Sequence, residues 1–328
     1  RKGGKFMQPI VLPDETRYAE QMRSEVLPAL AACSQCIPCT GEGGAALNVR
    51  LYAPAGAQRS IVLSHGFCES EEKLRELSWL FLQQGYAVLA YDHRGHGFSA
   101  REVADPSVVH VQDFDDYVRD LARVVEAARP QLPPGRPALF GHSMGGGIAA
   151  RALELYPDLF CRCVLHAPMI RVNTHGVPDP LAKAIARFFV AIGRGDRLFF
   201  AQKPYAPGER FEGACCTSPA RFAYYADLRR ETPALRTNGS SYRWILEALR
   251  SGDRLLQPEN LARIRTPALV IRAELDDLVR PDGQDAFVRG VPCARLVTIR
   301  GVKHEIYRSK NDQLLPYLET IFRFLEEE

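Results

Sequence analysis

The chain has 328 residues, of which 46% are hydrophobic and 25% charged, and its formal net charge is +3. It is long enough to bury a large core, and its length suits one domain that carries an inserted segment. No apolar run approaches the roughly 20 residues that cross a bilayer, which argues against an integral membrane protein. The modest basic excess and the lack of a G-x-x-x-x-G-K sequence argue against nucleotide and nucleic-acid binding.

The N-terminal part of the chain carries no recognisable targeting signal. The first residues, RKGGKFM, resemble neither a signal peptide nor a membrane anchor. Residues 1–45 are predicted to form an N-terminal extension that packs on the core. This stretch contains Cys33, Cys36 and Cys39, but no fourth ligand follows closely, so we predict no metal site and no cofactor. With nine cysteines in total, we expect a mostly reduced cytoplasmic chain rather than a disulfide scaffold.

Strand-like and helix-like segments alternate from residue 46 onward. The strand-like runs are 47–54, 60–66, 86–93, 138–143, 163–170, 267–274 and 295–302. The clearest helix is 113–129, whose spacing places Phe114, Tyr117, Leu121, Val124 and Ala128 on one face. A second helix at 312–327 closes the chain. This alternation predicts an α/β fold with a mostly parallel sheet and helices on both of its faces.

The strand-like run that begins at residue 138 ends in Gly141-His142-Ser143-Met144-Gly145 and continues directly as a helix-forming segment. A G-x-S-x-G sequence between a strand and a helix is typical of a nucleophile elbow. The two glycines fit this interpretation, because side chains at these positions would clash in the tight turn. We therefore predict that Ser143 is a nucleophile.

The alternation stops between about residues 171 and 250. This segment is helix-prone and contains thirteen Lys and Arg against seven Asp and Glu, a net charge of +6, whereas the rest of the chain has −3. We predict that 171–250 forms a helical cap on a core made of 46–170 and 251–328. A basic, aromatic cap suggests amphiphiles with anionic head groups, and residues 180–195 could touch a membrane surface. A cap helix that covers the active site with its charges in water is the simpler interpretation.

Two late strand-like runs end in residues that suit a serine hydrolase. The run 267–273 is followed by Glu274, Asp276 and Asp277, and the next run leads to His304. Catalytic residues in the order Ser, acid, His are expected when the nucleophile lies on such an elbow. His304 would act as general base and then as general acid, while the carboxylate fixes its tautomer. We prefer Asp276 as the acid because the apolar pair 278–279 follows it, and Asp277 is the main alternative.

A serine nucleophile also needs donors for the oxyanion that develops on the substrate carbonyl. One predicted donor is the backbone N–H of Met144, at a helix N-terminus whose dipole favours an anion. The early strand at 60–66 runs into His65-Gly66-Phe67, so the second predicted donor is the N–H of Phe67.

Five stretches together carry a family resemblance: SHGF, YDHRGHGFS at 91–99, GHSMGGG, ELDDLV and GVKHEI. They resemble the serine-hydrolase branch of the α/β-hydrolase superfamily that contains monoacylglycerol lipases, bacterial lysophospholipases and related carboxylesterases. The resemblance extends from about residue 46 to the C-terminus. It implies that Ser143, Asp276 and His304 form a catalytic triad and that Phe67 and Met144 form the oxyanion hole. The chain departs from the pattern at 273–275, where relatives commonly carry a glycine.

The resemblance implies a serine carboxylester hydrolase that acts on acyl esters, such as monoacylglycerol or lysophospholipid, through an acyl-enzyme. The expected partner is a small-molecule or lipid ester, and the expected location is cytoplasmic or peripheral at the membrane. A short-chain esterase is one alternative. A serine aminopeptidase of the same fold is another, but it would need cap carboxylates for the substrate ammonium, and the cap is basic.

Overall fold

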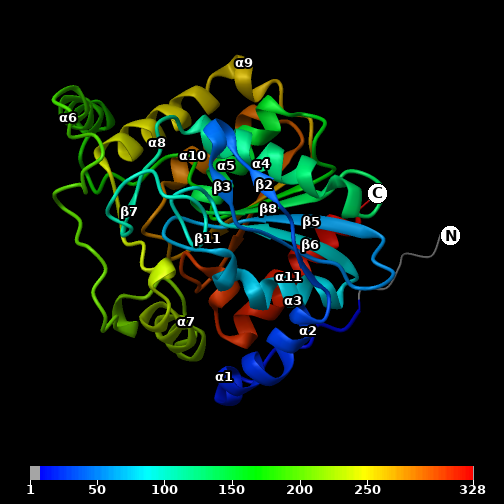
Figure 1. The fold of residues 1–328 in the computed structure, drawn as a ribbon. Coiled ribbons are helices and arrows are strands. Elements are labelled where there is room, and N and C mark those ends of the chain that lie inside the picture. The colour runs from blue at the N-terminus through cyan, green and yellow to red at the C-terminus, as the bar shows by residue number, and fades with distance from the viewer. Residues whose placement is uncertain (1–7, 328) are drawn as a thin grey trace.

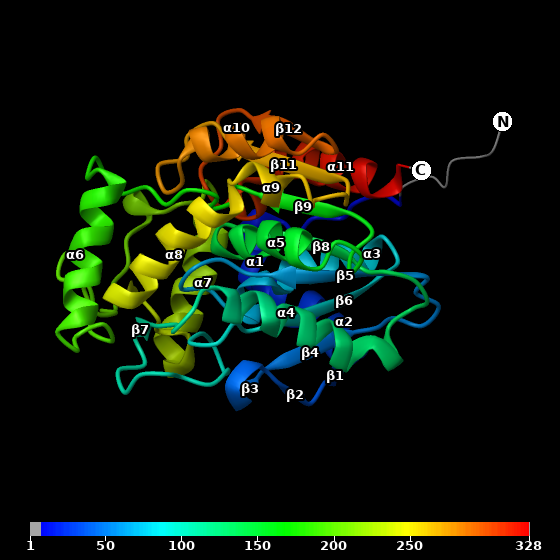
Figure 2. The ribbon, with the colours of Figure 1, turned by 90° about the horizontal axis from the view of Figure 1, so that it is seen from above.

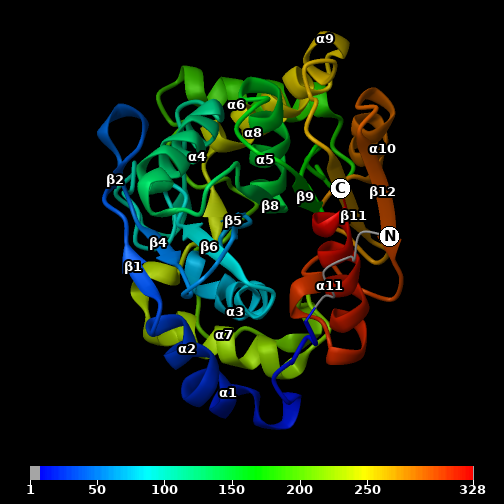
Figure 3. The same cartoon turned by 90° about the vertical axis from the view of Figure 1, so that its right-hand side faces the viewer.

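The computed structural model describes residues 8–327, so the segment RKGGKFM lies outside the described part of the chain. An eight-stranded sheet crosses the molecule in the order β1-β4-β6-β5-β8-β9-β11-β12 (Figure 3). The pairs β1–β4 and β4–β6 are antiparallel, and the other neighbours are parallel. The strands are β1 Ser34–Cys36, β4 Val49–Tyr52, β5 Arg59–Ser64, β6 Tyr86–Tyr91, β8 Ala138–His142, β9 Cys163–His166, β11 Ala268–Ala273 and β12 Ala294–Ile299.

Helices cover both faces of this sheet (Figures 1 and 3). One core cluster joins α4, α5, α8, α9 and α10 to one face, and a second joins α1, α2, α3 and α11 to the other. The helices are α1 Tyr18–Gln21, α2 Leu27–Ala31, α3 Arg75–Gln83, α4 Asp115–Ala128, α5 Met144–Leu155, α6 Asp179–Ala191, α7 Pro219–Glu231, α8 Tyr242–Leu255, α9 Pro258–Leu261, α10 Pro281–Gly290 and α11 Asn311–Glu326.

The predicted α/β fold is confirmed. Each of the seven predicted strands overlaps a strand of the large sheet, and the predicted helices correspond to α4 and α11. The sequence did not indicate β1, or the two-residue pairs β2 Cys39–Thr40 with β3 Ala46–Leu47 and β7 Val108–Val109 with β10 Gly239–Ser240. Such short strands contain too few residues for an alternating pattern to be recognised.

The segment 171–250 contains α6, α7 and the first part of α8, and α6 stands at the outer edge of the molecule (Figure 2). This segment also contains β10, for which the sequence shows no strand-like run and which pairs with β7 of the preceding part of the chain. Helix α8 continues to Leu255 and packs against α5. Residues 192–218 contain one short 3-10 helix at Phe211–Gly213 and are otherwise without helix or strand.

Helix α7 is fixed to the rest of the molecule by a buried arginine. The Arg221 side chain is fully buried, and its Nε donates to Glu76 Oε2 on α3 at 2.8 Å. The Tyr18 hydroxyl on α1 donates to the same carboxylate oxygen at 2.7 Å, and the Arg221 guanidinium lies 5.1 Å from the centre of the Tyr18 ring. We call Tyr18, Glu76 and Arg221 the Arg221 cluster. It joins the N-terminal segment, the core and α7.

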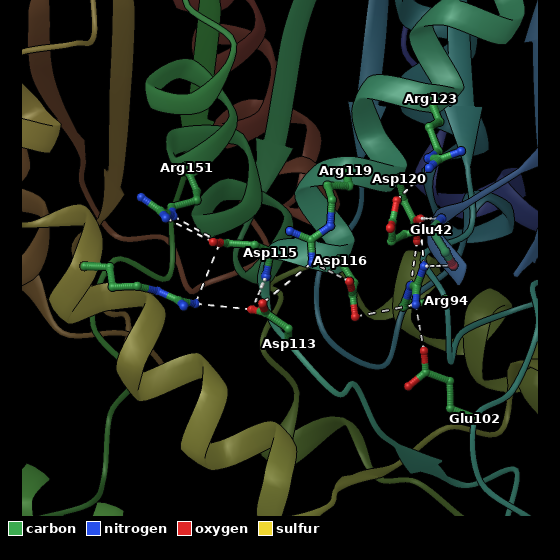
Figure 4. A network of polar contacts seen from close by, with 11 residues as sticks. Glu42, Arg94, Glu102, Asp113, Asp115, Asp116, Arg119, Asp120, Arg123 and Arg151 are labelled. Atoms are coloured by element: carbon green, nitrogen blue, oxygen red, sulfur yellow. Dashed lines mark hydrogen bonds and ion pairs between the residues drawn. The ribbon is translucent and has the colours of Figure 1, made fainter. Parts of the chain in front are cut away.

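A second polar network, shown in Figure 4, joins the loop after β2 and the loop after β6 to α4. Arg94 follows β6 and forms two hydrogen bonds to Asp120 of α4, with Nε–Oδ2 at 2.7 Å and Nη2–Oδ1 at 2.8 Å. Asp120 also accepts from the backbone N–H of Glu42 at 2.7 Å, and Arg94 donates to Glu102 at 2.8 Å. Neither Asp120 nor Arg94 is appreciably exposed, so each charge depends on its partners for stabilisation.

Candidate active site

Ser143 lies between the end of β8 and the beginning of α5. Its φ angle is +52°, a conformation that is unusual for a residue with a side chain and typical of a strained functional turn. A Cβ at Gly141 would overlap the carbonyl oxygen of Gly145, and a Cβ at Gly145 would overlap the carbonyl oxygens at the end of β5. The elbow therefore requires glycine at both positions, as the sequence suggested.

Asp276 and His304 lie on the loops after β11 and β12, which are adjacent parallel strands. His304 Nδ1 is 2.7 Å from Asp276 Oδ2, and both side chains are nearly completely buried. A carboxylate can only accept, so Nδ1–H is the donor and Nε2 is left able to take a proton. The His142 ring, which is next to Ser143 in sequence, is 4.9 Å from the His304 ring. Within residues 8–327, no hydrogen bond joins the Ser143 hydroxyl to His304.

The Asp276 carboxylate is held in its ionised form. Burial raises its pKa, but the hydrogen bond and the charge of His304 and the backbone N–H groups of Leu278 and Val279 outweigh burial, so the pKa of Asp276 lies below its ordinary value. The two N–H groups donate to Oδ1 at 2.9 and 3.3 Å. Asp277, the alternative acid, is exposed.

The two predicted oxyanion donors lie where the end of β5 meets the first turn of α5. Met144 is the first residue of α5, so its N–H has no acceptor inside the helix. Phe67 is in a turn closed by the Glu69 N–H, which donates to the Gly66 carbonyl at 3.3 Å. The Ser64 hydroxyl donates to the carbonyl of Gly145 at 3.3 Å, which ties the end of β5 to α5.

Three buried histidines support the turn that contains Phe67. His65 Nε2 accepts from the backbone N–H of His93 at 3.0 Å, so its proton is on Nδ1, which donates to the Gly66 carbonyl at 2.8 Å. The ring of His96 lies 5.2 Å from the His65 ring and 6.2 Å from the Phe67 ring. Burial lowers the pKa of His65, His93 and His96, so these rings remain neutral and serve as hydrogen-bonding and packing groups.

Sequence reasoning missed a buried charged cluster beside the site. Lys73 Nζ lies 2.7 Å from Glu69 Oε1 and 2.6 Å from Glu305 Oε1, so one ammonium joins the Phe67 turn to the residue that follows His304. Glu69 Oε2 accepts from the Gly66 N–H at 2.7 Å, and Glu69 Oε1 accepts from the Tyr307 hydroxyl at 2.8 Å. The four-residue spacing of Glu69 and Lys73 is the only local signal, because Glu305 lies far away in the sequence.

The charges in this cluster are mutually stabilised. Burial opposes ionisation of Glu69 and Glu305, but the Lys73 ammonium keeps the pKa of Glu69 well below its ordinary value and, with Arg308, lowers the pKa of Glu305 to about 2. Burial likewise opposes the charge on Lys73, and the two carboxylates raise its pKa. The cluster is therefore charged at neutral pH, and it links the two loops that carry Phe67 and His304.

Comparisons with known proteins agree with the fold of the chain. Residues 55–311 match the family model Hydrolase_4, described as serine aminopeptidase, S33. A probable lysophospholipase L2 of Haemophilus influenzae is 29% identical over 277 residues, which cover 84% of this chain and 86% of that protein. A monoacylglycerol lipase of Mycolicibacterium smegmatis is 27% identical over 84% of this chain and 91% of its own length. The crystal structure of a thermostable carboxyl esterase from Bacillus coagulans superposes with a TM-score of 0.73 at 16% identity, covering 89% of this chain and 98% of the esterase.

Proposed function

Because this chain belongs to the Hydrolase_4 family of α/β-hydrolases, we propose that it is a serine carboxylester hydrolase with the triad Ser143, Asp276 and His304. One observation carries the proposal: the buried 2.7 Å contact between His304 and Asp276, with the His304 ring 4.9 Å from the ring of His142 in the strained elbow. In the proposed core, residues 46–170 supply the nucleophile and residues 251–328 supply the acid and the base. Residues 171–250 form the proposed cap.

The proposed reaction proceeds in two halves. Ser143 Oγ attacks the acyl carbonyl while His304 Nε2 takes the hydroxyl proton, and the imidazolium then protonates the departing alcohol. Water activated by His304 next attacks the acyl-enzyme and releases the acid. Asp276 holds the imidazole tautomer and stabilises the imidazolium, a role supported by its lowered pKa. The N–H groups of Phe67 and Met144 receive the oxyanion in both halves.

The proposed substrates are monoacylglycerols or lysophospholipids. The relatives named lysophospholipase L2 and monoacylglycerol lipase match more than four-fifths of this chain, which supports a long-chain acyl ester. A short-chain esterase is the alternative within the same chemistry. An aminopeptidase, as in the family description, would need carboxylates to bind an ammonium, and the net charge of 171–250 is +6.

The direct test is hydrolysis of p-nitrophenyl esters from two to sixteen carbons, beside a monoacylglycerol, a lysophosphatidylcholine and an aminoacyl p-nitroanilide. We expect the rate on esters to rise with chain length, because a longer acyl chain buries more apolar area, and we expect monoacylglycerol or lysophospholipid to be hydrolysed. Turnover confined to two- to four-carbon esters would indicate a short-chain esterase instead. Turnover of the anilide alone would indicate a peptidase.

We further propose that the outer face of α6 contacts a membrane surface. Leu181 and Phe188 of this helix, and Ile192 directly after its last residue, follow one another at intervals of seven and four residues and have exposed fractions of 52%, 59% and 50%. Exposed Arg187 and Arg194 flank these side chains, which suits an anionic lipid surface. No helix in residues 8–327 combines the length and apolar character needed to pass through a bilayer.

Replacing Phe188 and Ile192 together by serine should weaken binding to phosphatidylglycerol vesicles by about tenfold or more, because each side chain would lose the stabilisation of burial in the lipid. The measurement is co-sedimentation with vesicles. Val11→Ser is the matched control, because Val11 is equally exposed but lies in the N-terminal segment. Equal binding of the double variant and the wild type would contradict the proposed contact.

A further inference from the structure

Glu69 lies in the turn after β5, two residues beyond Phe67, and its side chain is only 3% exposed. Its two carboxylate oxygens have different partners. Oε2 accepts from the backbone N–H of Gly66 at 2.7 Å, whereas Oε1 accepts from the Lys73 ammonium at 2.7 Å and from the Tyr307 hydroxyl at 2.8 Å. A buried carboxylate is costly unless its oxygens are bonded and its charge is paired, and both conditions are met here. These partners hold the carboxylate in one orientation.

The backbone of Glu69 fixes the peptide group that contains the Phe67 N–H. The carbonyl of that group belongs to Gly66, and it accepts from the Glu69 N–H at 3.3 Å and from His65 Nδ1 at 2.8 Å. In a planar trans peptide group, the carbonyl and the N–H point in opposite directions. The two donors on the carbonyl therefore set the direction of the Phe67 N–H, which is the proposed oxyanion donor.

The side chain of Glu69 fixes the preceding peptide group. The Gly66 N–H belongs to the peptide group that begins at the His65 carbonyl, and this is the N–H that donates to Glu69 Oε2. Both peptide groups that flank Gly66 are therefore bonded to Glu69. A glycine has no Cβ and adopts many backbone conformations unless other groups restrict it. Glu69 supplies the restriction that residue 66 itself lacks.

The turn lies directly against the elbow of Ser143, and this contact requires glycine at residue 66. A Cβ at Gly66 would be 2.9 Å from Cδ2 of His142 and 3.0 Å from Oε2 of Glu69. His142 directly precedes Ser143, and its Nε2 is 3.5 Å from Glu69 Oε1. Because only glycine fits between these groups, the conformation of the turn has to be fixed by bonds from neighbouring residues.

Lys73 and Tyr307 connect Glu69 to the loop that carries His304. The Lys73 ammonium lies 2.6 Å from Oε1 of Glu305, which directly follows His304. Tyr307, whose hydroxyl donates to Glu69, comes three residues after His304. One carboxylate oxygen is thus bonded toward the loop of the proposed base, and the other is bonded to the turn of the proposed oxyanion donor.

We propose that Glu69 is a positioning residue for ester hydrolysis: it orients the Phe67 N–H and holds this donor in a fixed place relative to His304. The inference rests on the proposed function and adds to it a residue outside the triad and the oxyanion hole. Glu69 acts through Gly66 and not on the substrate. It should therefore stabilise the transition state, in which the oxyanion develops, more than it stabilises the bound substrate.

Glu69→Gln is the direct test, because an amide has one acceptor oxygen in place of the two that the carboxylate uses. The variant cannot accept from Gly66 on one side and from Lys73 and Tyr307 on the other. We expect kcat on a long-chain p-nitrophenyl ester to fall about tenfold or more, while KM stays within about threefold. Removal of an oxyanion donor costs on the order of 10²–10³ in rate, and this variant misdirects the donor without removing it.

Glu154→Gln is the matched control. Glu154 is as buried as Glu69 and is paired with Arg151, but it lies near the C-terminal end of α5, more than two helical turns beyond Ser143. The same change from carboxylate to amide is made there inside another buried ion pair. We expect kcat and KM of Glu154→Gln to stay within about twofold of the wild type, even if this variant is less stable.

Two inhibitors distinguish a misplaced oxyanion donor from a general loss of structure. The Ser143 oxygen adds to the carbonyl of a long-chain trifluoromethyl ketone, and the oxyanion that forms requires the same donors as the transition state. In Glu69→Gln its inhibition constant should rise about tenfold or more. An ether with the same alkyl chain forms no adduct, so its inhibition constant should stay within about threefold. Equal weakening of both inhibitors, or an unchanged kcat, would overturn the inference.

A second variant covers the case in which Glu69→Gln does not fold. In Glu69→Gln/Lys73→Met the ammonium is removed as well, and Glu305 remains paired with Arg308 at 2.6 Å, so no charge of the cluster is left unpaired. The same fall in kcat at nearly constant KM is expected, because the Gly66 N–H has still lost its carboxylate. A kcat equal to that of the wild type would overturn the inference here too.

Hydrogen exchange separates this inference from the proposed function. The backbone amides of residues 64–70 should exchange faster in Glu69→Gln than in the wild type, whereas Glu154→Gln should leave their exchange unchanged. Unchanged exchange in Glu69→Gln would overturn the inference whether or not the wild type hydrolyses esters. A wild type that hydrolyses no ester would contradict the proposed function instead.

Discussion

Ser143→Ala should lower the rate of ester hydrolysis at least about 10³-fold while leaving the fold intact. The substitution removes the attacking oxygen, so His304 has no hydroxyl to deprotonate and no acyl-enzyme can form. The residual rate would come from substrate binding and oxyanion stabilisation alone. The backbone strain at residue 143 is equally compatible with alanine, so thermal unfolding should change little. The measurement is kcat/KM on a long-chain p-nitrophenyl ester and on monoacylglycerol.

Ser78→Ala is the matched control for this experiment. Ser78 is on α3, its side chain is fully buried, and its Oγ has no hydrogen-bond partner in the described part of the chain. The same atom is deleted there without touching the proposed site, so activity should be retained. Substantial hydrolysis by Ser143→Ala would refute the assignment of the nucleophile and with it the proposed mechanism.

The largest expected effect on stability is at Asp120. Asp120→Ala should lower the free energy of unfolding by about 3 kcal/mol or more, because it leaves the buried Arg94 guanidinium without its two-bond partner and the Glu42 N–H without an acceptor. Glu102 still pairs with Arg94 in this variant, which limits the loss. The measurement is urea unfolding followed by circular dichroism.

Glu126→Ala on the same helix is the control for Asp120→Ala. Glu126 pairs with Arg129 at 2.9 Å, but both side chains are largely exposed, so the expected loss is below about 1 kcal/mol. If the two variants had the same free energy of unfolding, the network of Figure 4 would contribute no more to stability than an exposed ion pair.

The sequence predicts those parts of the fold in which a hydrophobic pattern repeats or in which a tight turn requires a particular residue type. The alternation of apolar segments predicts the sheet because parallel strands are buried on both faces and read as continuous apolar runs. Ser143 is predicted to be the nucleophile because the tight turn around it requires Gly141 and Gly145. The order of Asp276 and His304 along the chain then follows from the order of the strands that precede them.

The contacts that pattern analysis missed join residues distant in sequence. Lys73 and Glu305 are 232 positions apart, and nothing near either residue indicates the other. The same holds for Asp120, which interrupts the apolar face of α4 and would be read as a surface residue if Arg94 were not beside it.

Because of the Arg221 cluster, the two helices α6 and α7 of the segment 171–250 differ in how many substitutions they tolerate. The position of α7 is constrained, because a substitution at Arg221 removes the cation that pairs with the buried carboxylate of Glu76. Helix α6 buries only Ala186, so substitutions, insertions and deletions there cost little in folding. Descendants of this chain can therefore vary the outer surface of α6, while the frame that α7 forms with α1 and α3 is inherited unchanged.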